Sequence, residues 1–563
     1  MMKFRQHQRQ QHKRKAITSI AVLPLTAALF AAGAMAAQTQ GAGLAGETPQ
    51  MRQLHQALSL AEHGNAQEAM NLVRDLLQQD PKFVPALKLK GMLLEESGRT
   101  TEAAAAYEQG LQLAPNDTDL LLKAGIYKLA QHKVDEAIKL LEHSTRILPA
   151  DGDAQFYLAQ AYHLDGKDAP ALAAIRLSLK AEPDNPSVVQ KYGELLSSSG
   201  NYQEGLRWLL KAQKADISLP HLDYEIGVAD YKLMDIDGAA ANLTKEVAAH
   251  PDDVDALELL ASAEIKLAHW PEAKEAYARL VAIRPGDANE LLGLGHCQVE
   301  MQEFQAAVDT LNATLRLDPT LLQSHFYLAR AYAGLGKPEE AQHEAALHRL
   351  MMDKESFVRA EENEQHEDAI KPQARQMLRE AHEEDALKLY RERFKEASSS
   401  DADAYVFIGK LYLFMGKTED GLRCLHHALA INSGVRGAHT YEGILALKQG
   451  EFDNAEAQFK AELANDPNYQ TAIAEMGEIR YRQGRWQEAA DLLAKSRTMT
   501  PELLYMLCDA YFHLGNATDA NLNAEAAAAY GRNNPALMKG LIDLLKRNGQ
   551  TELAGRLSAN MKP

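Results

Sequence analysis

Apolar residues follow a helical period over most of this chain, and residues 254–285 show the pattern most clearly. The stretch reads VDALELLASAEIKLAHWPEAKEAYARLVAIRP. Apolar or small residues recur three and four positions apart in each half, which marks one face of a 3.6-residue helix: Leu257, Leu260, Ala261, Ile265 and Ala268, then Ala273, Ala276, Tyr277, Leu280 and Val281. Pro271 suits the first position of a helix, and Pro285 ends one because it lacks an amide donor. The pattern predicts two short helices with a turn near His269.

This helical hairpin recurs every 34 residues. Prolines mark the period at 81, 115, 149, 183, 251, 285 and 319, with Ile217 in the one vacant slot. Nine units counted from 50, 84, 118, 152, 186, 220, 254, 288 and 322 all carry Ala or Gly at their eighth and twentieth positions. Small residues let two helices cross with their backbones close together, and a glycine inside a helix otherwise costs roughly 1 kcal/mol. We therefore expect these positions to be the crossing points of each helix pair.

The unit resembles the tetratricopeptide repeat (TPR), a 34-residue signature with a small residue at position eight, Tyr at eleven, Ala at twenty and Pro at thirty-two. Ala159, Tyr162, Ala171 and Pro183 match all four positions within one unit. The resemblance extends over roughly residues 50 to 560. It implies an all-α fold, a superhelical solenoid of about fourteen to fifteen helix-turn-helix repeats in two arrays.

The period divides the chain into a first array at 50–350, with nine 34-residue repeats, and a second array at 402–563 that ends in a polar cap. Between them, residues 351–401 break the period, and half of the residues from 353 to 396 are charged. Ile370, Ala374 and Leu378 keep helical spacing, as do Ala386 and Tyr390. We interpret 351–401 as a charged helical hinge with a divergent repeat; a disordered linker is the alternative.

The first 36 residues follow the pattern of a secretory signal peptide. A basic head without acidic residues precedes a short apolar run, IAVLPLTAALFAA, and then the small-x-small sequence that ends at Ala36. An uncleaved anchor is the alternative, but this run falls short of the about 20 apolar residues that span a bilayer. We expect cleavage after Ala36, a flexible leader at 37–49, no stable transmembrane segment after cleavage, and an exported, periplasmic protein; association with the envelope is the alternative.

The charge of the chain argues against nucleic acid as a partner. The formal net charge is −18, and it becomes −24 without the six basic residues of the signal peptide. Proteins that bind a phosphate backbone carry clusters of Lys and Arg instead.

No motif for catalysis, cofactor binding or metal binding stands out. The three cysteines, Cys297, Cys424 and Cys508, are far apart and lie in expected helices, so we interpret them as buried apolar residues. The stretch HEAALH at 343–348 places its histidines five apart rather than four, on different helix faces. Gly416 to Thr418 reads GKT without the upstream glycine or strand of a phosphate-binding loop, and we expect a turn there. We therefore expect no metal, no cofactor and no enzymatic activity; an active site assembled inside the groove is the alternative.

The TPR resemblance implies a partner-binding groove, lined on its concave side by the fifth, ninth and twelfth positions of each first helix. A protein or peptide is the expected partner. Side chains in these positions are Phe156, Gln160, Tyr224, Tyr231, His296, Phe326 and Arg330. For Tyr231 and Phe326, packing between neighbouring units is the alternative. The resulting hypothesis is a non-catalytic exported scaffold; a structural component of an envelope assembly or secretion machine, of the polysaccharide-export or pilus type, is the alternative.

Overall fold

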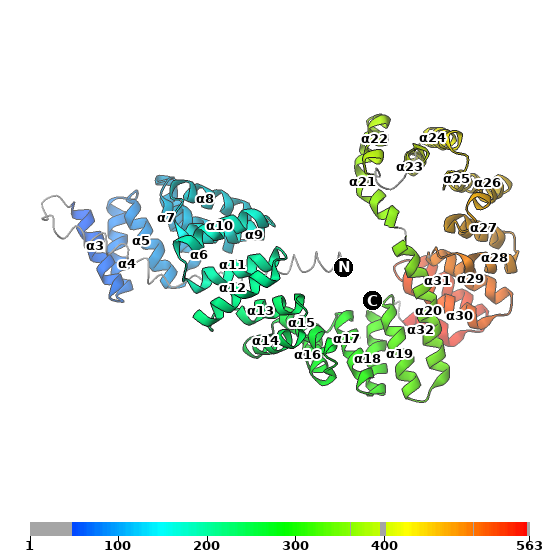
Figure 1. Ribbon diagram of the computed structural model, residues 1–563, viewed down its shortest axis with the longest axis horizontal. Coiled ribbons are helices and arrows are strands. Elements are labelled where there is room, and N and C mark those ends of the chain that lie inside the picture. Colours follow the sequence, from blue (N-terminus) through cyan, green and yellow to red (C-terminus); the bar gives the residue numbers. More distant parts are fainter. Residues whose placement is uncertain (1–47, 361, 394–400, 499, 560–563) are drawn as a thin grey trace. The chain divides into compact units, whose positions relative to one another are not determined.

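A computed structural model describes residues 48–360, 362–393, 401–498 and 500–559, and all regular structure in these ranges is helical (Figure 1). The all-α prediction is confirmed. The described residues form two compact units, which meet in the sequence between Ala268 and His269. The predicted signal peptide and nearly all of the predicted leader lie outside the described residues. Among the residues that are described, no helix combines the length and the apolar character needed to cross a bilayer.

The described part of the first unit is a series of helices of 11 to 14 residues. They are α3 Pro49–Glu62, α4 Ala66–Gln79, α5 Val84–Glu96, α6 Thr100–Leu113, α7 Thr118–Ala130, α8 Val134–Ile147, α9 Gly152–Leu164, α10 Asp168–Ala181, α11 Pro186–Ser198, α12 Tyr202–Ala215, α13 Leu222–Lys232, α14 Ile236–Ala249 and α15 Val254–Lys266. Ala268, expected on the face of a helix, instead lies in the turn after α15 with φ 58°.

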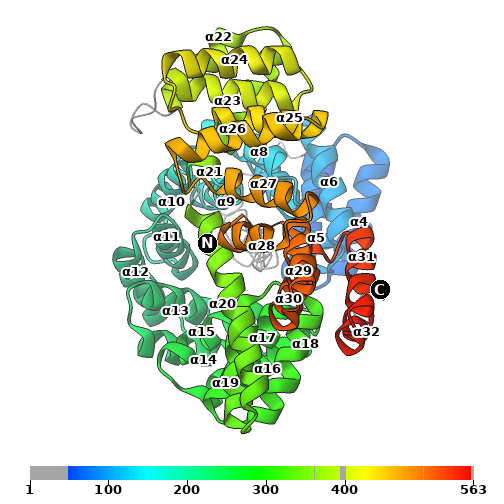
Figure 2. The same cartoon turned by 90° about the vertical axis from the view of Figure 1, so that its right-hand side faces the viewer.

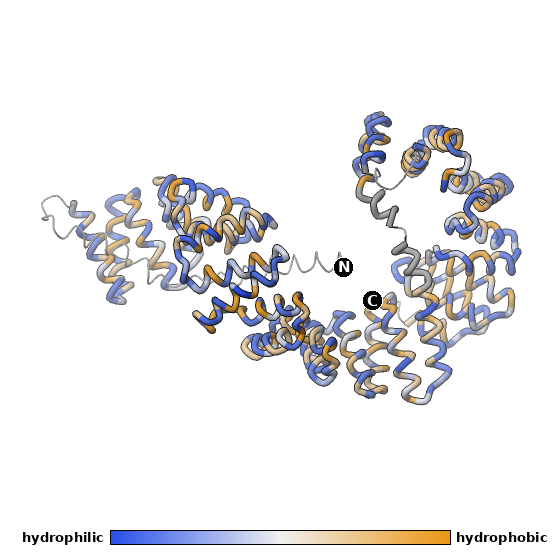
Figure 3. Tube along the Cα trace, in the orientation of Figure 1, coloured by the Kyte–Doolittle hydropathy of each residue, from blue (hydrophilic) through white to orange (hydrophobic). Residues whose placement is uncertain are grey.

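The second unit continues the series with more variation in length. Its helices are α16 Trp270–Ile283, α17 Ala288–Glu300, α18 Phe304–Leu317, α19 Leu322–Gly334, α20 Pro338–Ala360, α21 Glu362–Arg379, α22 Glu383–Arg393, α23 Asp401–Phe414, α24 Thr418–Ile431, α25 Ala438–Gln449, α26 Phe452–Asn465, α27 Gln470–Arg482, α28 Trp486–Lys495, α29 Pro501–His513, α30 Ala517–Gly531, α31 Pro535–Arg547 and α32 Thr551–Ala559. Figure 3 shows polar and apolar residues alternating along these helices, as the amphipathic pattern requires.

The small residues mark close helix crossings, as expected. A Cβ atom added to Gly193 on α11 would lie 2.8 Å from Leu209 Cγ and 3.0 Å from the backbone oxygen of Gly205, both on α12. Most alanines at these positions, such as Ala57 and Ala69, are fully buried, whereas Ala329 and Ala341 are half-buried. Each apolar cluster of the first unit draws mainly on consecutive helices, which is how a stack of repeats builds its core.

Most first helices begin with a side-chain cap. Asp117, Asp151 and Asp253 each accept a hydrogen bond from a backbone amide in the first turn of the helix that follows. Such a cap satisfies one of the amides that a helix start leaves without a partner. Several turns between paired helices use glycine in the left-handed region, including Gly416 at φ 76° in the predicted GKT turn, whereas others place a residue such as Ala268 or Gln302 there.

Helices α13 and α25 are capped in a different way. Each follows a residue in the left-handed region that provides no side-chain cap, His221 at φ 57° and Gly437 at φ 89°. A buried glutamate from the second helix of the same repeat reaches back to the amides instead. Glu462 Oε1 and Oε2 accept from the amides of Gly437 at 2.8 Å and Thr440 at 3.1 Å. Glu246 occupies the same repeat position in α14 and accepts a hydrogen bond from a backbone amide at the start of α13.

The predicted boundary at 350/351 falls inside a helix. α20 runs for 23 residues, because no proline or glycine follows Pro338 to end it. The helix pair expected after it is present as α21 and α22. Ile370, Ala374 and Tyr390 of this pair are buried in one cluster with Phe407 of α23.

Helix α30, near the C-terminus, packs against α20, a contact that the repeat pattern did not predict (Figure 2). Leu350 of α20 lies against the apolar cluster of α29 to α32. His343 of α20 bonds Glu525 of α30, with 3.2 Å between Nε2 and Oε2. The second unit therefore joins helices that are about 180 residues apart in the chain.

The residues considered for chemistry in the sequence serve packing in the structure. Cys297, Cys424 and Cys508 are free thiols and fully buried, as expected. In the HEAALH stretch, His343 pairs with α30 while Glu344 bonds His325 of α19 at 2.6 Å. These two side chains therefore have separate partners.

Candidate functional site: the faces of the first helices

Three of the sequence-predicted residues come together on α17 and α19, and we call this surface the α17–α19 face. Phe326 and Arg330 are one turn apart on α19, while Leu328 and Ala331 of the same helix are buried. Phe326 is 44% exposed as a residue, which is unusual for a phenylalanine. His296 of α17 stacks on Tyr327 of α19 with 4.3 Å between the ring centroids.

An ion pair joins the two helices of this face. The two terminal guanidinium nitrogens of Arg330, Nη1 and Nη2, donate to the carboxylate of Glu300 on α17, the longer contact being 3.2 Å from Nη2 to Oε2. The hydrogen bond from Arg330 lowers the pKa of Glu300, against the opposing effect of burial. Burial lowers the pKa of His296 below its usual value. Near neutral pH the face therefore presents an exposed phenyl ring beside an intact ion pair and an uncharged imidazole.

The predicted residues of the first unit are less closely gathered. Phe156 and Gln160 are half-buried one turn apart on α9, and Phe156 meets the ring of Tyr157 edge-on with 5.3 Å between centroids. Tyr231 of α13 is also half-buried, and the Lys266 ammonium of α15 lies 4.2 Å from its ring centroid. The contact with the following repeat agrees with the packing alternative for Tyr231.

Tyr224 was expected at the surface, but the structure buries it to 8% exposure. Its backbone amide donates to Glu246 Oε2 at 3.3 Å, as part of the unusual cap of α13. This start of the helix is packed inward, so Tyr224 offers little surface to a partner.

The residues that hold the α17–α19 face together lie outside the predicted groove positions. Tyr327 and Glu300 are one position removed from the expected groove positions, and Trp270 of α16 adds a third ring, 5.3 Å from His296. A usable signal was present, because Glu300 and Arg330 have opposite charges in adjacent first helices. The positional rule considered each helix separately and did not compare neighbours.

Known proteins resemble this chain in part. The protein CTR9 homolog of Arabidopsis thaliana is 23% identical over 46% of this chain and 24% of its own length. The peroxisomal targeting signal receptor of Komagataella phaffii is 26% identical over 45% of this chain and 33% of its own length. The chain thus spans well under half the length of the curated relatives it matches.

Solved structures are similar to parts of this chain at low sequence identity. YrrB, described as a TPR protein with an unusual peptide-binding site, is 18% identical over 33% of this chain and 96% of its own, with a TM-score of 0.29. Pseudomonas aeruginosa pilF is 18% identical over 38% of this chain and 97% of its own, with a TM-score of 0.34. Sequence models of the tetratricopeptide repeat match residues 44–207, 224–288, 408–470 and 441–503. The chain therefore belongs to the tetratricopeptide repeat family.

Proposed function

We propose that this protein is an exported scaffold that binds a protein or extended peptide on the faces of its first helices and catalyses no reaction. Repeats of this family serve as protein-interaction scaffolds. The observation that carries the proposal is the α17–α19 face, where an aromatic side chain is exposed beside a fixed ion pair. Exposed aromatics next to a rigid polar frame are typical of binding hot spots.

In this proposal Phe326 is the apolar anchor. A partner side chain covers its exposed ring, while the Glu300–Arg330 pair offers both an acceptor and donors to the partner backbone. The rings of His296 and Tyr327 lie beside Phe326. They lose little freedom on binding, because they already stack on each other. A helix or an extended segment laid across α17 and α19 satisfies this arrangement.

Quantitative affinity capture tests the proposal. The tagged full-length chain is crosslinked in living cells and captured from the periplasmic fraction as wild type, as the double variant F326A/R330A, and as the control variant L210A. Leu210 is 45% exposed, much like Phe326, but lies on the second helix α12. We expect wild type and L210A to capture the same partner in equal amounts. The amount captured by the double variant should be lower by about 30-fold or more, since hot-spot residues contribute roughly 2 kcal/mol each to binding. Equal recovery with all three proteins would contradict the proposal.

Export is tested separately. Mass spectrometry of the purified protein is expected to find a mature chain that begins at Ala37. A chain that retains its first 36 residues would instead support the anchored alternative. Membrane fractionation distinguishes the two forms of the scaffold: a free soluble pool supports a partner-binding protein, whereas complete co-sedimentation with the outer membrane supports a structural component of an envelope machine.

A further inference from the structure

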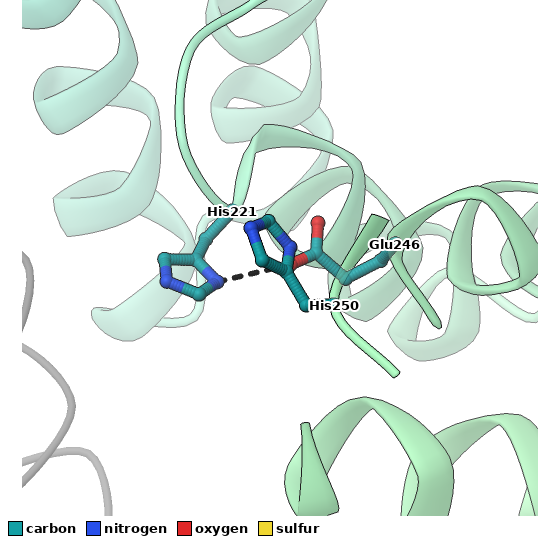
Figure 4. A group of neighbouring side chains, drawn as sticks. All are labelled: His221, Glu246 and His250. Carbon is teal, nitrogen blue, oxygen red and sulfur yellow. Dashed lines mark hydrogen bonds and ion pairs between the residues drawn. The ribbon is translucent and has the colours of Figure 1, made fainter. Parts of the chain in front are cut away.

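Two histidines and a buried glutamate meet at the start of α13 in the first unit (Figure 4). Nδ1 of His221 lies 2.9 Å from Glu246 Oε1, and Nδ1 of His250 lies 2.8 Å from the same oxygen. The two imidazole rings stack, with 5.0 Å between their centroids. One carboxylate oxygen therefore faces two imidazole nitrogens.

Two elements bring these residues together. His221 occupies the left-handed turn before α13, while Glu246 lies in the last turn of α14 and His250 is the residue that caps the end of the same helix. Asp253, which caps α15 through Oδ1, places its Oδ2 3.6 Å from His221 Nδ1. Its side chain is 4% exposed and that of Glu246 is 3% exposed, so both carboxylates are shielded from solvent.

The role of Glu246 as a helix cap does not account for the histidines. Glu462 holds the start of α25 from the same repeat position, and there both carboxylate oxygens bond backbone amides. The histidine nearest to that cap, His439, bonds Gln458 instead. At Glu246 one oxygen bonds the Tyr224 amide and the other is directed to the two histidines. The pair of imidazoles is thus an addition specific to this repeat.

We propose that this cluster is a binding site for a divalent transition metal of the zinc class. The ligands are Nδ1 of His221, Nδ1 of His250 and Oε1 of Glu246, a set of two histidines and one glutamate that suits Zn²⁺. Asp253 Oδ2 supplies the fourth position, directly or through water. Each imidazole binds the metal in its neutral form and carries its remaining proton on Nε2.

The distances fit a site that adjusts slightly on binding. Ligand atoms around a tetrahedral Zn²⁺ are about 3.3 Å apart for bonds of 2.0 to 2.1 Å. The three ligand atoms lie within 4.8 Å of one another, and the two pairs that share Glu246 Oε1 need to separate by only a few tenths of an ångström. The Tyr224 amide continues to hold Oε2, which orients the carboxylate as an outer-shell partner does.

A metal here has a structural consequence. It ties the turn before α13 to the end of α14 and, through Asp253, to the start of α15. This turn follows the one position of the first array where the recurring proline is replaced, by Ile217, which is 80% exposed. The metal thereby adds a tie to a loop whose proline, Pro220, lies three positions after the regular slot.

Calorimetric titration of the full-length, chelator-treated protein with ZnCl₂ tests this site. We expect the wild type to bind one Zn²⁺ more tightly than any other, and affinity at that site to fall by at least about 100-fold in H250A and in H221A. His250 is 46% exposed, and its replacement leaves the Tyr224 bond to Glu246 intact, so these variants are expected to stay folded by circular dichroism. The matched control H439A removes a histidine near the other glutamate cap and is expected to bind Zn²⁺ like the wild type.

Cobalt provides a second measurement that does not depend on stability. Co²⁺ in place of Zn²⁺ is expected to give tetrahedral ligand-field absorption in the wild type and H439A, and none in the H221A/H250A double variant. If the wild type binds no Zn²⁺ tightly, or if the double variant keeps the wild-type affinity and absorption, the cluster is only a hydrogen-bonded cap and the proposal is overturned.

Discussion

Replacing Gly193 by alanine tests the idea that small residues exist here for helix packing. The new Cβ would lie 2.8 Å from Leu209 Cγ and 3.0 Å from both the Gly205 oxygen and the Leu209 nitrogen. Because two of these three atoms are backbone, α11 and α12 have to move apart. Overpacking of this kind costs about 1 to 3 kcal/mol, while alanine in a helix returns roughly 0.5 to 1 kcal/mol. The net expectation is a local destabilisation of about 0.5 to 2 kcal/mol.

Native-state hydrogen exchange on the full-length chain measures this effect, since stacked repeats open locally rather than all at once. In G193A the amides of α11 and α12 should exchange about 2- to 30-fold faster, at a factor of ten for each 1.4 kcal/mol. Gly555 in α32 is the matched control, because a Cβ there meets nothing within 4 Å. G555A should slow exchange in α32 by about 2- to 5-fold. Slower exchange in G193A as well would refute the packing explanation.

Two further predictions concern polar contacts. Replacing Glu462 by alanine leaves the amides of Gly437 and Thr440 without their acceptor, and each unsatisfied amide costs about 1 to 3 kcal/mol of local stability. Hydrogen exchange at the start of α25 should therefore accelerate at least about 5-fold. Unchanged exchange would show that water replaces the cap. The hydrogen bond to Glu525 raises the pKa of His343 above its ordinary 6.5, against burial, so its stabilising contribution is complete below pH 6.5 and is lost as the pH rises through the raised value. The melting temperature of the wild type should therefore fall as the pH rises over that range, whereas the melting temperature of H343Q should not show this fall. Parallel plots of melting temperature against pH for the two proteins would contradict this.

Much of the fold could be predicted because its signals are local. Each repeat carries its own apolar face, its small residues at the crossing and its proline, so helix bounds follow from a short window of sequence. The contact between α20 and α30 has no such signal, because it joins Leu350 and His343 to residues about 180 positions later. The length of α20 was missed for a simpler reason. Loss of the 34-residue period suggested a boundary, although the sequence from 338 to 360 holds no helix breaker after its first residue.

The candidate site was predictable only where its positions follow the regular repeat. Phe326 and Arg330 share a helix face because they are four residues apart, and their positions within the 34-residue repeat are enough to predict this. Tyr224 occupies the equivalent position but is buried, because α13 starts from a left-handed residue and a distant glutamate cap. The cluster of His221, Glu246 and His250 could not be predicted for a related reason. Glu246 and His250 are visibly one turn apart, whereas His221 reaches them only through the unusual turn before α13.

Site-specific photocrosslinking tests the central claim, partner binding on the first helices, most directly. A photoreactive phenylalanine analogue replaces Phe326 in one full-length protein and Leu210 of α12 in another, and both are irradiated in living cells. The account predicts a discrete crosslinked species from position 326 and none from position 210. No crosslink at position 326, or the same species from both positions, would contradict it.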